Sequence, residues 1–205
     1  PLASILGLVN LMKVEGVPEH LHEYVSRIES SISRLDNFVS SMLNHAKVSR
    51  QEIASEPIQL KALLQQCLEN FEYVENYQKV QVHIQEDKQA EFRSDALRLS
   101  IIFNNIISNA FKYANAAQEE SFLRISIQYL PQYVLIRLQD NGLGIEPDYL
   151  ERVFDMFFRA NEKAADGSGL GLYIVKQSVE KLGGSIEIES ELWQGTSITL
   201  RLPST

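Results

Sequence analysis

The strongest constraint on the fold is a pair of apolar segments that alternate with polar residues and lie only two residues apart. SFLRISIQYL begins at Ser121, YVLIRLQD ends at Asp140, and only Pro131 and Gln132 separate them. Alternation with a period of two is typical of a strand with one buried face, and so short a link joins neighbouring antiparallel strands. The chain is therefore expected to build a sheet around this hairpin.

Helical and strand-like patterns lie on both sides of this hairpin. Helices are expected at 58–72, 96–114 and 170–184, and further strands at 79–85, 185–190 and 196–203, with a shorter candidate at 90–95. Gly183 and Gly184 end the last helix. A mixed order that includes adjacent antiparallel strands indicates an α+β fold, a sandwich with helices on one face of a mixed sheet.

The first fifty residues follow a different pattern. Apolar residues recur with alternating spacings of four and three over three heptads: Leu21, Val25, Ile28, Ile32, Leu35, Val39 and Met42. The same rhythm precedes them at Leu2, Ile5, Val9 and Met12. Gly16 and Pro18 interrupt it, so the pattern predicts a helical hairpin.

Such a hairpin buries too little surface to be stable alone. A dimeric four-helix bundle is favoured over a hairpin folded onto the rest of the chain, because the apolar seam outruns any one partner. The seam is lost after about residue 50, and Pro57 follows. We therefore expect a dimerisation hairpin at 1–52 and a second domain at 53–205.

Composition excludes several classes of function. The 205 residues carry a net charge of −8, which argues against a broad nucleic-acid-binding surface. No apolar run approaches the roughly 20 residues that span a membrane, and no signal peptide is visible. The chain opens at Pro1 inside a helical pattern, so we expect a piece of a longer protein, with any membrane attachment in segments outside it. The single cysteine, Cys67, has helical spacing from leucines and is expected in the core.

Four histidines invite a test for metal binding: His20, His22, His45 and His83. No further cysteine, aspartate or histidine stands at ligand spacing from the first pair. We expect surface histidines rather than a zinc site.

Two stretches place glycines two residues apart beside aliphatic residues: DNGLGIEP from Asp140 and GSGLGLYIVK from Gly167. Neither contains a Walker loop. The dinucleotide fingerprint fails because Leu172 stands where its third glycine belongs, and a nucleophile elbow fails because Asp166 replaces its first glycine. A different nucleotide-binding arrangement, or a pair of ordinary turns, remains.

Position favours a binding site over ordinary turns. Asp140 ends a strand, where a carboxylate can accept a hydrogen bond from an amine, and the second stretch opens into a helix, whose first amides form an anion site. Asn105, Asn109 and Lys112 share one face of the long helix. Buried asparagines need partners, and a metal ion or phosphate oxygens would satisfy them.

In order along the chain, five segments resemble the boxes of the catalytic half of sensor histidine kinases of two-component systems. These are NNIISNAFKY, DNGLGI, VFDMFFRA, GSGLGLYIVK and GTSITLRLP. The kinases belong to a wider ATPase family with DNA gyrase, MutL and the heat-shock chaperone ATPases. The resemblance covers about residues 58–203 and implies a Bergerat ATP-binding fold with ATP and Mg²⁺ as cofactors.

For the base of ATP, the resemblance implies that Asp140 accepts from the exocyclic amine of adenine and that Thr196 lies behind the base near it. Glycines would let the backbone approach the base. Four further residues are expected around the nucleotide: Tyr113, Gly142, Gly144 and Ile145.

For the phosphates, the resemblance implies that Asn109 binds Mg²⁺, with Asn105 beside it, and that Lys112 contacts phosphate. The second glycine box would hinge a lid and present amides to phosphate: Gly167, Ser168, Gly169, Leu170, Gly171 and Leu172. Residues 146–168 would form this lid, which Phe157 and Phe158 anchor. Arg159 or Lys163 would reach the phosphates from it.

The phosphoacceptor histidine of these kinases stands in a motif whose proline matches Pro1, so it is expected five positions earlier. No catalytic residue of that kind is expected within 1–205. The resemblance implies a cytoplasmic homodimer whose parent phosphorylates a histidine and then a response-regulator receiver domain, with an inner-membrane anchor as an option for the parent. Two alternatives stay open: a degenerate nucleotide-binding or dimerisation module, and an ATPase clamp of the gyrase or MutL type, which needs a transducer domain after the last strand.

Overall fold

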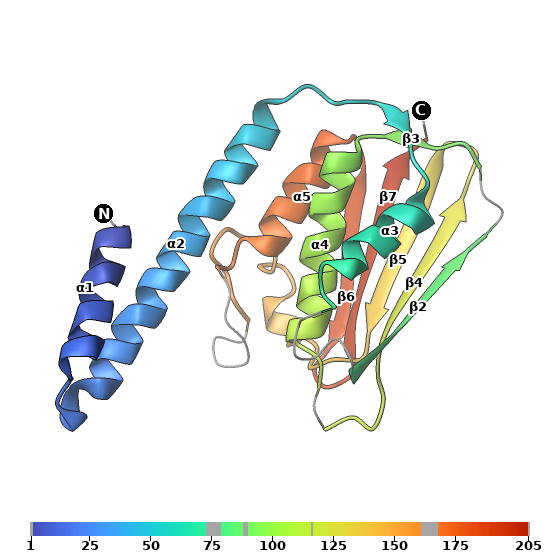
Figure 1. Cartoon of the computed structure of the whole chain (residues 1–205). Helices are drawn as coiled ribbons and strands as arrows, with labels where there is room; N and C mark the ends of the chain where they lie inside the picture. The colour runs from blue at the N-terminus through green and yellow to red at the C-terminus, as the bar shows by residue number, and fades with distance from the viewer. Residues whose placement is uncertain (1, 73–78, 88–89, 116, 161–167, 205) are drawn as a thin grey trace.

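The computed structural model of the chain describes residues 2–72, 79–87, 90–115, 117–160 and 168–204 (Figure 1). The helices are α1 (Leu2–Glu15), α2 (His22–Arg50), α3 (Leu60–Glu69), α4 (Ala96–Lys112) and α5 (Gly171–Lys181), with short 3₁₀ turns η1 (Glu19–Leu21) and η3 (Pro147–Tyr149). The strands are β1 (Glu56–Pro57), β2 (Val80–Glu86), β3 (Arg93–Ser94), β4 (Ser121–Tyr129), β5 (Tyr133–Asp140), β6 (Ser185–Glu191) and β7 (Gly195–Pro203).

Five strands form one mixed sheet in the order β2-β4-β5-β7-β6. The pair β2 and β4 is parallel, and the other three pairs are antiparallel. The predicted hairpin is the centre of this sheet, where Leu123 faces Asp140 and Tyr129 faces Val134. The predicted α+β architecture is confirmed.

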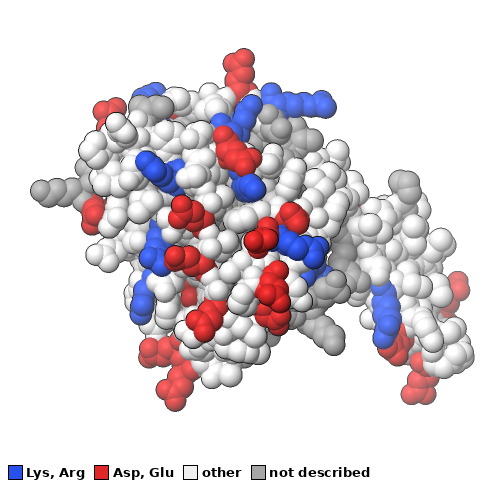
Figure 2. Space-filling model, turned by 180° about the vertical axis from the view of Figure 1, so that it is seen from behind, with Lys and Arg blue, Asp and Glu red and all other residues white. Residues whose placement is uncertain are grey.

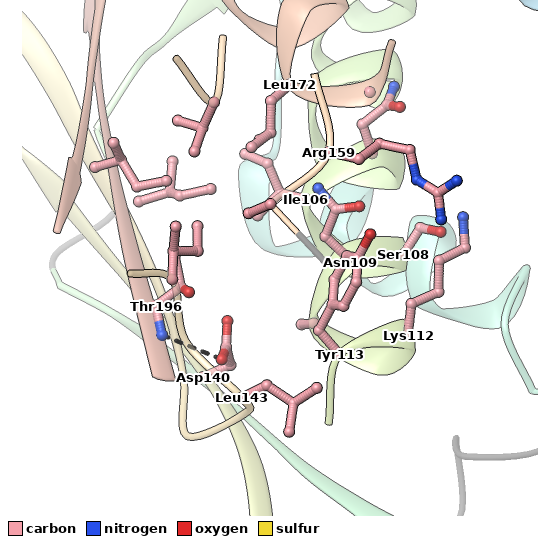
Figure 3. Close-up of a pocket in the computed structure, with 18 of the residues that line it drawn as sticks. Ile106, Ser108, Asn109, Lys112, Tyr113, Asp140, Leu143, Arg159, Leu172 and Thr196 are labelled. Carbon is pink, nitrogen blue, oxygen red and sulfur yellow. Dashed lines mark hydrogen bonds between the residues drawn. The ribbon is translucent and has the colours of Figure 1, made fainter. Parts of the chain in front are cut away.

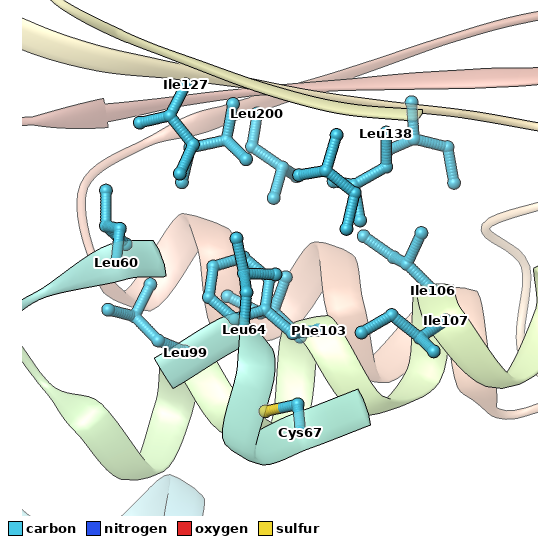
Figure 4. Close-up of a cluster of buried hydrophobic side chains, with 14 of the residues drawn as sticks. Leu60, Leu64, Cys67, Leu99, Phe103, Ile106, Ile107, Ile127, Leu138 and Leu200 are labelled. Atoms are coloured by element: carbon cyan, nitrogen blue, oxygen red, sulfur yellow. The ribbon is translucent and has the colours of Figure 1, made fainter. Parts of the chain in front are cut away.

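One face of the sheet carries the core. Alternate residues of β4, β5 and β7 are buried, including Ile127, Leu138 and Leu200, and they pack against α3, α4 and α5 (Figure 4). Phe103 and Ile107 of α4 lie in the middle of that layer and are fully buried. The helices therefore cover a single face of the sheet, as the alternating pattern predicts.

Cys67 lies in the same core (Figure 4) and is 3% exposed. Burial raises the pKa of its thiol, although a hydrogen bond with Ser100 opposes the change. The prediction of a core thiol is confirmed.

The candidate strand at 90–95 is the weakest of the predicted elements. Only Arg93 and Ser94 pair, and they pair with Glu56 and Pro57 in a separate two-stranded sheet. Proline has no backbone N–H to donate, so this ladder is short.

Within the described residues, the hairpin buries only two residues of the heptad seam on α2. Val25 and Ile32 are buried and pack with Val9 of α1. The other row of the seam faces outward, with Ile28 and Leu35 about half exposed at 48% and 51%. The residues of one predicted stripe therefore divide into a row that closes the hairpin and a row that remains open.

A buried ion pair joins the end of α2 to the start of α4. Asp95 caps α4 by accepting from the backbone N–H of Arg98 at 2.9 Å, and the two side chains also form an ion pair. The Arg98 guanidinium then donates to the carbonyls of Val48 and Gln51 at 2.9 and 2.6 Å. These carbonyls lie in the last turn of α2 and at its C-cap, where the helix has no further N–H groups of its own to satisfy them fully.

Charged side chains of both signs are interspersed on the face seen from behind (Figure 2). Arg137 on β5 and Glu189 on β6 form an exposed ion pair at 3.2 Å. Among the described helices, none is long and apolar enough to cross a membrane.

Candidate functional site

A cavity of about 500 Å³ opens between α4, the start of α5 and the ends of β5 and β7 (Figure 3). Its size is in the range of small-molecule and cofactor sites. Most of the predicted site residues line it: Asn105, Asn109, Lys112, Tyr113, Asp140, Gly144, Ile145, Phe158, Arg159, Ser168, Gly169, Gly171, Leu172 and Thr196. Residues about 90 positions apart in the chain therefore meet around one space.

Asp140 is the acidic residue among those that line the cavity, and the pKa of its carboxyl is shifted far from its ordinary value. Its Oδ1 accepts hydrogen bonds from the backbone N–H groups of Gly142 at 2.9 Å and Thr196 at 3.2 Å. Its Oδ2 accepts none from the residues that the structure describes, and the carboxylate points into the cavity (Figure 3). Burial raises the pKa of this carboxyl to about 6, although the two amides lower it. A ligand N–H that donates to Oδ2 would stabilise the charged form of this carboxylate.

The turn between β6 and β7 fixes the loop after Asp140. The N–H of Ile145 donates to the Ser190 hydroxyl at 2.9 Å, and the N–H of Trp193 donates to the carbonyl of Leu143 at 2.7 Å. The N–H of Leu143 donates to the carbonyl of Tyr113 at 2.9 Å, at the end of α4. Backbone hydrogen bonds thus tie three separate segments together at this end of the cavity.

The first glycine pair serves this packing before it serves any ligand. A Cβ at Gly142 would collide with the carbonyl of Tyr113, and Gly144 has a φ of +65° with its face against the carbonyl of Glu191. Gly144 also lines the cavity, whereas Gly142 does not. The expected approach of Gly142 to the base is thus replaced by an approach of the protein's own backbone.

The two asparagines of α4 have different surroundings. Asn105 donates to the carbonyl of Ile101 at 2.8 Å, and its Oδ1 would lie 3.1 Å from a Cβ at Gly171. Asn109 lies one turn further on, lines the cavity and has no side-chain hydrogen bond to the described residues. Both are half-buried rather than buried. Of the two, Asn105 commits its NH₂ group to the helix backbone, whereas Asn109 has both ends of its amide available to a ligand.

Cationic side chains gather beyond Asn109. The side chains of Lys112 and Arg159 lie on the same side of the cavity, next to Ser108 (Figure 3). Ser168 and Gly169 line it from the start of the second glycine box. An anionic group would find both charges and backbone amides there.

Some predictions about this end receive no support or no test. Leu170 is only 2% exposed and does not line the cavity, so it is a packing residue. Lys163 and Gly167 lie outside the described residues.

The two phenylalanines of the predicted lid diverge. Phe158 lines the cavity and contacts Tyr149, with ring centres 5.6 Å apart. Phe157 has a φ of +70° and turns the other way, to lie 5.2 Å from the ring of Phe38 on α2. The segment is anchored at both residues, but on different partners.

The sequence patterns did not predict the apolar walls of the cavity. They come from strand residues, from the glycine loop and from the segment after it: Leu123, Leu138, Leu143, Val153, Ile188 and Ile198. Strand alternation identifies such residues as buried, but it does not say whether a helix or a ligand covers them. Leu143, between the two glycines of the first box, was the one available signal.

The described histidines form no metal site. No group of three or more His, Cys, Asp or Glu residues suited to a metal ion occurs in the described part of the chain. His22 instead contacts the carbonyl of Val17 at 2.6 Å, at the hairpin turn.

Residues 94–205 match the family model of the histidine kinase-, DNA gyrase B- and HSP90-like ATPases. The chain belongs to this ATPase family. The match covers more than half of the chain and includes every described residue assigned above to the two ends of the cavity.

Relatives within the ATPase family extend the likeness to the hairpin. The sensor histidine kinase RcsC of Salmonella typhimurium is 27% identical over 99% of this chain, and the sensor protein SrrB of Staphylococcus aureus is 27% identical over 99%. The chain spans only 22% and 36% of these two relatives. The full-length ShkA structure, a complex with AMPPNP, superposes with a TM-score of 0.73 at 24% identity, over 100% of this chain and 43% of that one. The predicted relationship to the catalytic region of sensor histidine kinases is confirmed.

Proposed function

We propose that the chain binds ATP with Mg²⁺ in the cavity and supplies the γ-phosphoryl group to a histidine. The observation that carries this proposal is the pairing of two unlike ends in one cavity. A half-buried carboxylate, Asp140, with one oxygen open to a ligand lies at one end, and the amide of Asn109 with two cations beyond it lies at the other.

The base end suits an amino group. The free Oδ2 of Asp140 is an acceptor when ionised, and apolar side chains such as Leu143 and Ile188 form walls for a flat ring. A carbonyl in the same place would set lone pairs against lone pairs, at a cost of about 1–3 kcal/mol. Adenine is therefore favoured over guanine.

The phosphate end suits magnesium in a limited way. Mg²⁺ prefers hard oxygen ligands and keeps several waters and phosphate oxygens. Asn109 offers one amide oxygen, and no cluster of carboxylates accompanies it in the described residues. Magnesium would thus arrive with the nucleotide, and Asn109 would orient it.

The remaining residues hold charge and geometry. Lys112 and Arg159 lie where phosphate oxygens would carry negative charge (Figure 3), and Ser168 and Gly169 line the same cavity. Positioning and charge neutralisation are most of what phosphoryl transfer requires of a protein.

A kinase is favoured over an ATPase clamp because the likeness does not stop at the ATPase domain. The two curated relatives align over 99% of the chain, with the hairpin included, and both are sensor proteins. The degenerate-module alternative lacks a supporting observation, since Asp140 and Asn109 both face the cavity.

The experiment starts from a longer natural protein that contains these residues and a histidine at the expected upstream position. Incubation with labelled Mg·ATP should give an acid-labile, base-stable phosphate, which is lost when that histidine is replaced. The 1–205 chain should bind nucleotide without acquiring label. Nucleotide hydrolysis without protein labelling would favour the clamp instead.

We also propose that the chain forms a homodimer through the open row of the hairpin. The exposed large apolar residues of the hairpin are Ile5, Leu8, Leu11, Met12, Val14, Leu21, Tyr24, Ile28, Leu35, Val39, Met42 and Leu43. So many exposed apolar side chains on one hairpin favour an interface. Leu35→Glu should give monomers by light scattering, whereas Ser33→Glu, on an exposed position of the same helix, should leave the dimer intact. A monomeric unaltered chain would contradict the proposal.

The partner in the second transfer is proposed to be a response-regulator receiver domain, because the relatives are sensor proteins. The domain would work in the cytoplasm, and any membrane anchor would lie in other parts of the protein. Transfer of label from the phosphorylated longer protein to a purified receiver domain tests this, and a receiver that stays unlabelled would contradict it.

A further inference from the structure

The hydroxyl of Ser190 lies at the centre of three hydrogen bonds. It contacts the backbone N of Ile145 at 2.9 Å, the carbonyl of Gly195 at 2.7 Å and the hydroxyl of Thr196 at 2.9 Å. Ser190 is half-buried on β6 and does not itself line the cavity. Thr196 does line it.

Counting protons fixes the direction of these bonds. The N–H of Ile145 can only donate and the carbonyl of Gly195 can only accept, while a serine hydroxyl has one proton. That proton must therefore go to Gly195. The bond between Ser190 and Thr196 then has only one possible sense, with the Thr196 hydroxyl as donor.

Thr196 consequently turns its proton away from the cavity and its lone pairs remain for a ligand. Its backbone N–H binds Oδ1 of Asp140, so the two residues lie side by side at the base end (Figure 3). Above its pKa, the carboxylate is an acceptor only. Both polar groups at this end of the cavity thus accept and neither donates.

We propose that Ser190 is a positioning residue that sets the direction of the Thr196 hydroxyl and so makes the base end select an amino group over a carbonyl. This inference rests on the proposed function, because it assumes that a purine nucleotide occupies the cavity. Its ligand class is a purine with an amino group at position 6. Without Ser190, the Thr196 hydroxyl could turn and donate to a carbonyl.

The test is a calorimetric titration with two probes, ADP and IDP, which carries a carbonyl in place of the amino group. The unaltered chain should prefer ADP. Ser190→Ala should lower the ratio of ADP to IDP affinity by at least about fivefold, the low end of the effect of a mismatched buried polar group. Ser190→Thr, which keeps the hydroxyl, should restore the ratio. Ser185→Ala, at an exposed position of the same strand, is the matched control.

A second variant tests the direction of the hydroxyl with no change at Ser190. Thr196→Val removes the hydroxyl that is proposed to accept from the amino group. The affinity for ADP should therefore fall more than the affinity for IDP. If IDP loses more, the hydroxyl donates to the ligand and the inference is wrong.

The outcomes distinguish a failure of this inference from a failure of the proposed function. If Ser190→Ala weakens ADP and IDP equally, the serine only holds the turn together and the inference fails, while the proposed function stands. If the unaltered chain binds neither nucleotide, the proposed function fails and takes this inference with it.

Discussion

The two ends of the cavity are built in different ways. At the base end, the main polar group is held by backbone: two N–H groups bind Asp140 Oδ1, and the loop that follows is fixed to the β6–β7 turn. At the phosphate end, the polar groups are the side chains of Asn109, Lys112 and Arg159, and Lys112 is exposed.

This difference separates recognition from affinity. A group held by backbone needs no ordering when a ligand arrives, so the base end can discriminate at little entropic cost. Long side chains must be ordered on binding, so the phosphate end should contribute affinity that depends on metal and salt. The base end should therefore decide which nucleotide binds, and the phosphate end how tightly.

Replacement of the base-end carboxylate should have the largest effect. In Asp140→Asn, the amide oxygen can keep the two backbone N–H groups, so the NH₂ group points at the adenine amine, donor against donor. ADP affinity should fall about five- to 150-fold. Titration calorimetry measures this, with exposed Asp148→Asn as the control. Unchanged affinity would remove Asp140 from the site.

The same substitution should stabilise the free protein, which sharpens the comparison. A buried carboxylate with a pKa of about 6 costs the fold free energy at neutral pH. Asp140→Asn removes that cost, so the free energy of unfolding at pH 7 should rise, by at most about 3 kcal/mol. Thermal denaturation without nucleotide tests this. A lower melting temperature would show that the carboxylate is structural.

Asn109→Ala should weaken the contribution of Mg²⁺ to nucleotide binding and leave recognition of the base unchanged. The Mg²⁺ dependence of ADP binding should largely disappear, with a loss on the order of tenfold in the presence of the metal. Adenosine alone should bind as before, because the base end is elsewhere in the cavity. Asn104→Ala on the same helix is a matched control, since Asn104 does not line the cavity. A collapse of adenosine binding would mean that Asn109 is structural.

The pH dependence should come from the base end. The carboxylate form of Asp140 accepts from adenine, so affinity should approach its full value by about pH 7, fall by half near pH 6 and be about tenfold weaker at pH 5. Folding has the opposite sign. The folded pKa lies above the ordinary value of 3.8, so the stabilisation that is present below that value is lost as the pH rises through about 6. Adenosine titrations between pH 5 and 8 check the first statement, and a flat profile would contradict it.

Lys112→Ala should have the smallest effect. Its side chain is exposed, so its attraction to phosphate is screened, and ADP affinity should fall by no more than about fivefold at low salt and less at high salt. Lys181→Ala, also exposed but at the far end of α5, is the control. A salt-independent loss larger than that from Asp140→Asn would reverse the division between the two ends.

The sequence predicted the parts of this molecule that local patterns govern. Alternation located the hairpin of β4 and β5, and helical spacing located α4 with Asn105, Asn109 and Lys112 on one face. The order of the glycine boxes led to the ATPase family, which the family match confirms. The alternation and the helical spacing are local, and the boxes are short local motifs that are recognised by their order along the chain.

The contacts between distant segments could not be predicted in this way. The heptad pattern does not distinguish Ile32, which closes the hairpin, from Ile28, which stays exposed. The glycine spacing does not reveal that Gly142 meets the carbonyl of Tyr113. The hydroxyl of Ser190 on β6 has no local signature, because its partners lie across a turn and on another loop.

The predicted domain boundary near residue 53 does not coincide with a break in the hydrogen bonds, because Arg98 binds the end of α2. A cut before residue 53 separates the predicted domains in sequence, yet it removes the carbonyls of Val48 and Gln51 that the buried guanidinium binds. The guanidinium is 2% exposed with these carbonyls in place, so the cut would take away acceptors that now satisfy it and would uncover its ion pair with Asp95. The end of α2 therefore supplies hydrogen-bond partners to the ATPase domain. Any rotation of α2 acts directly on the first turn of α4, the helix that carries Asn109.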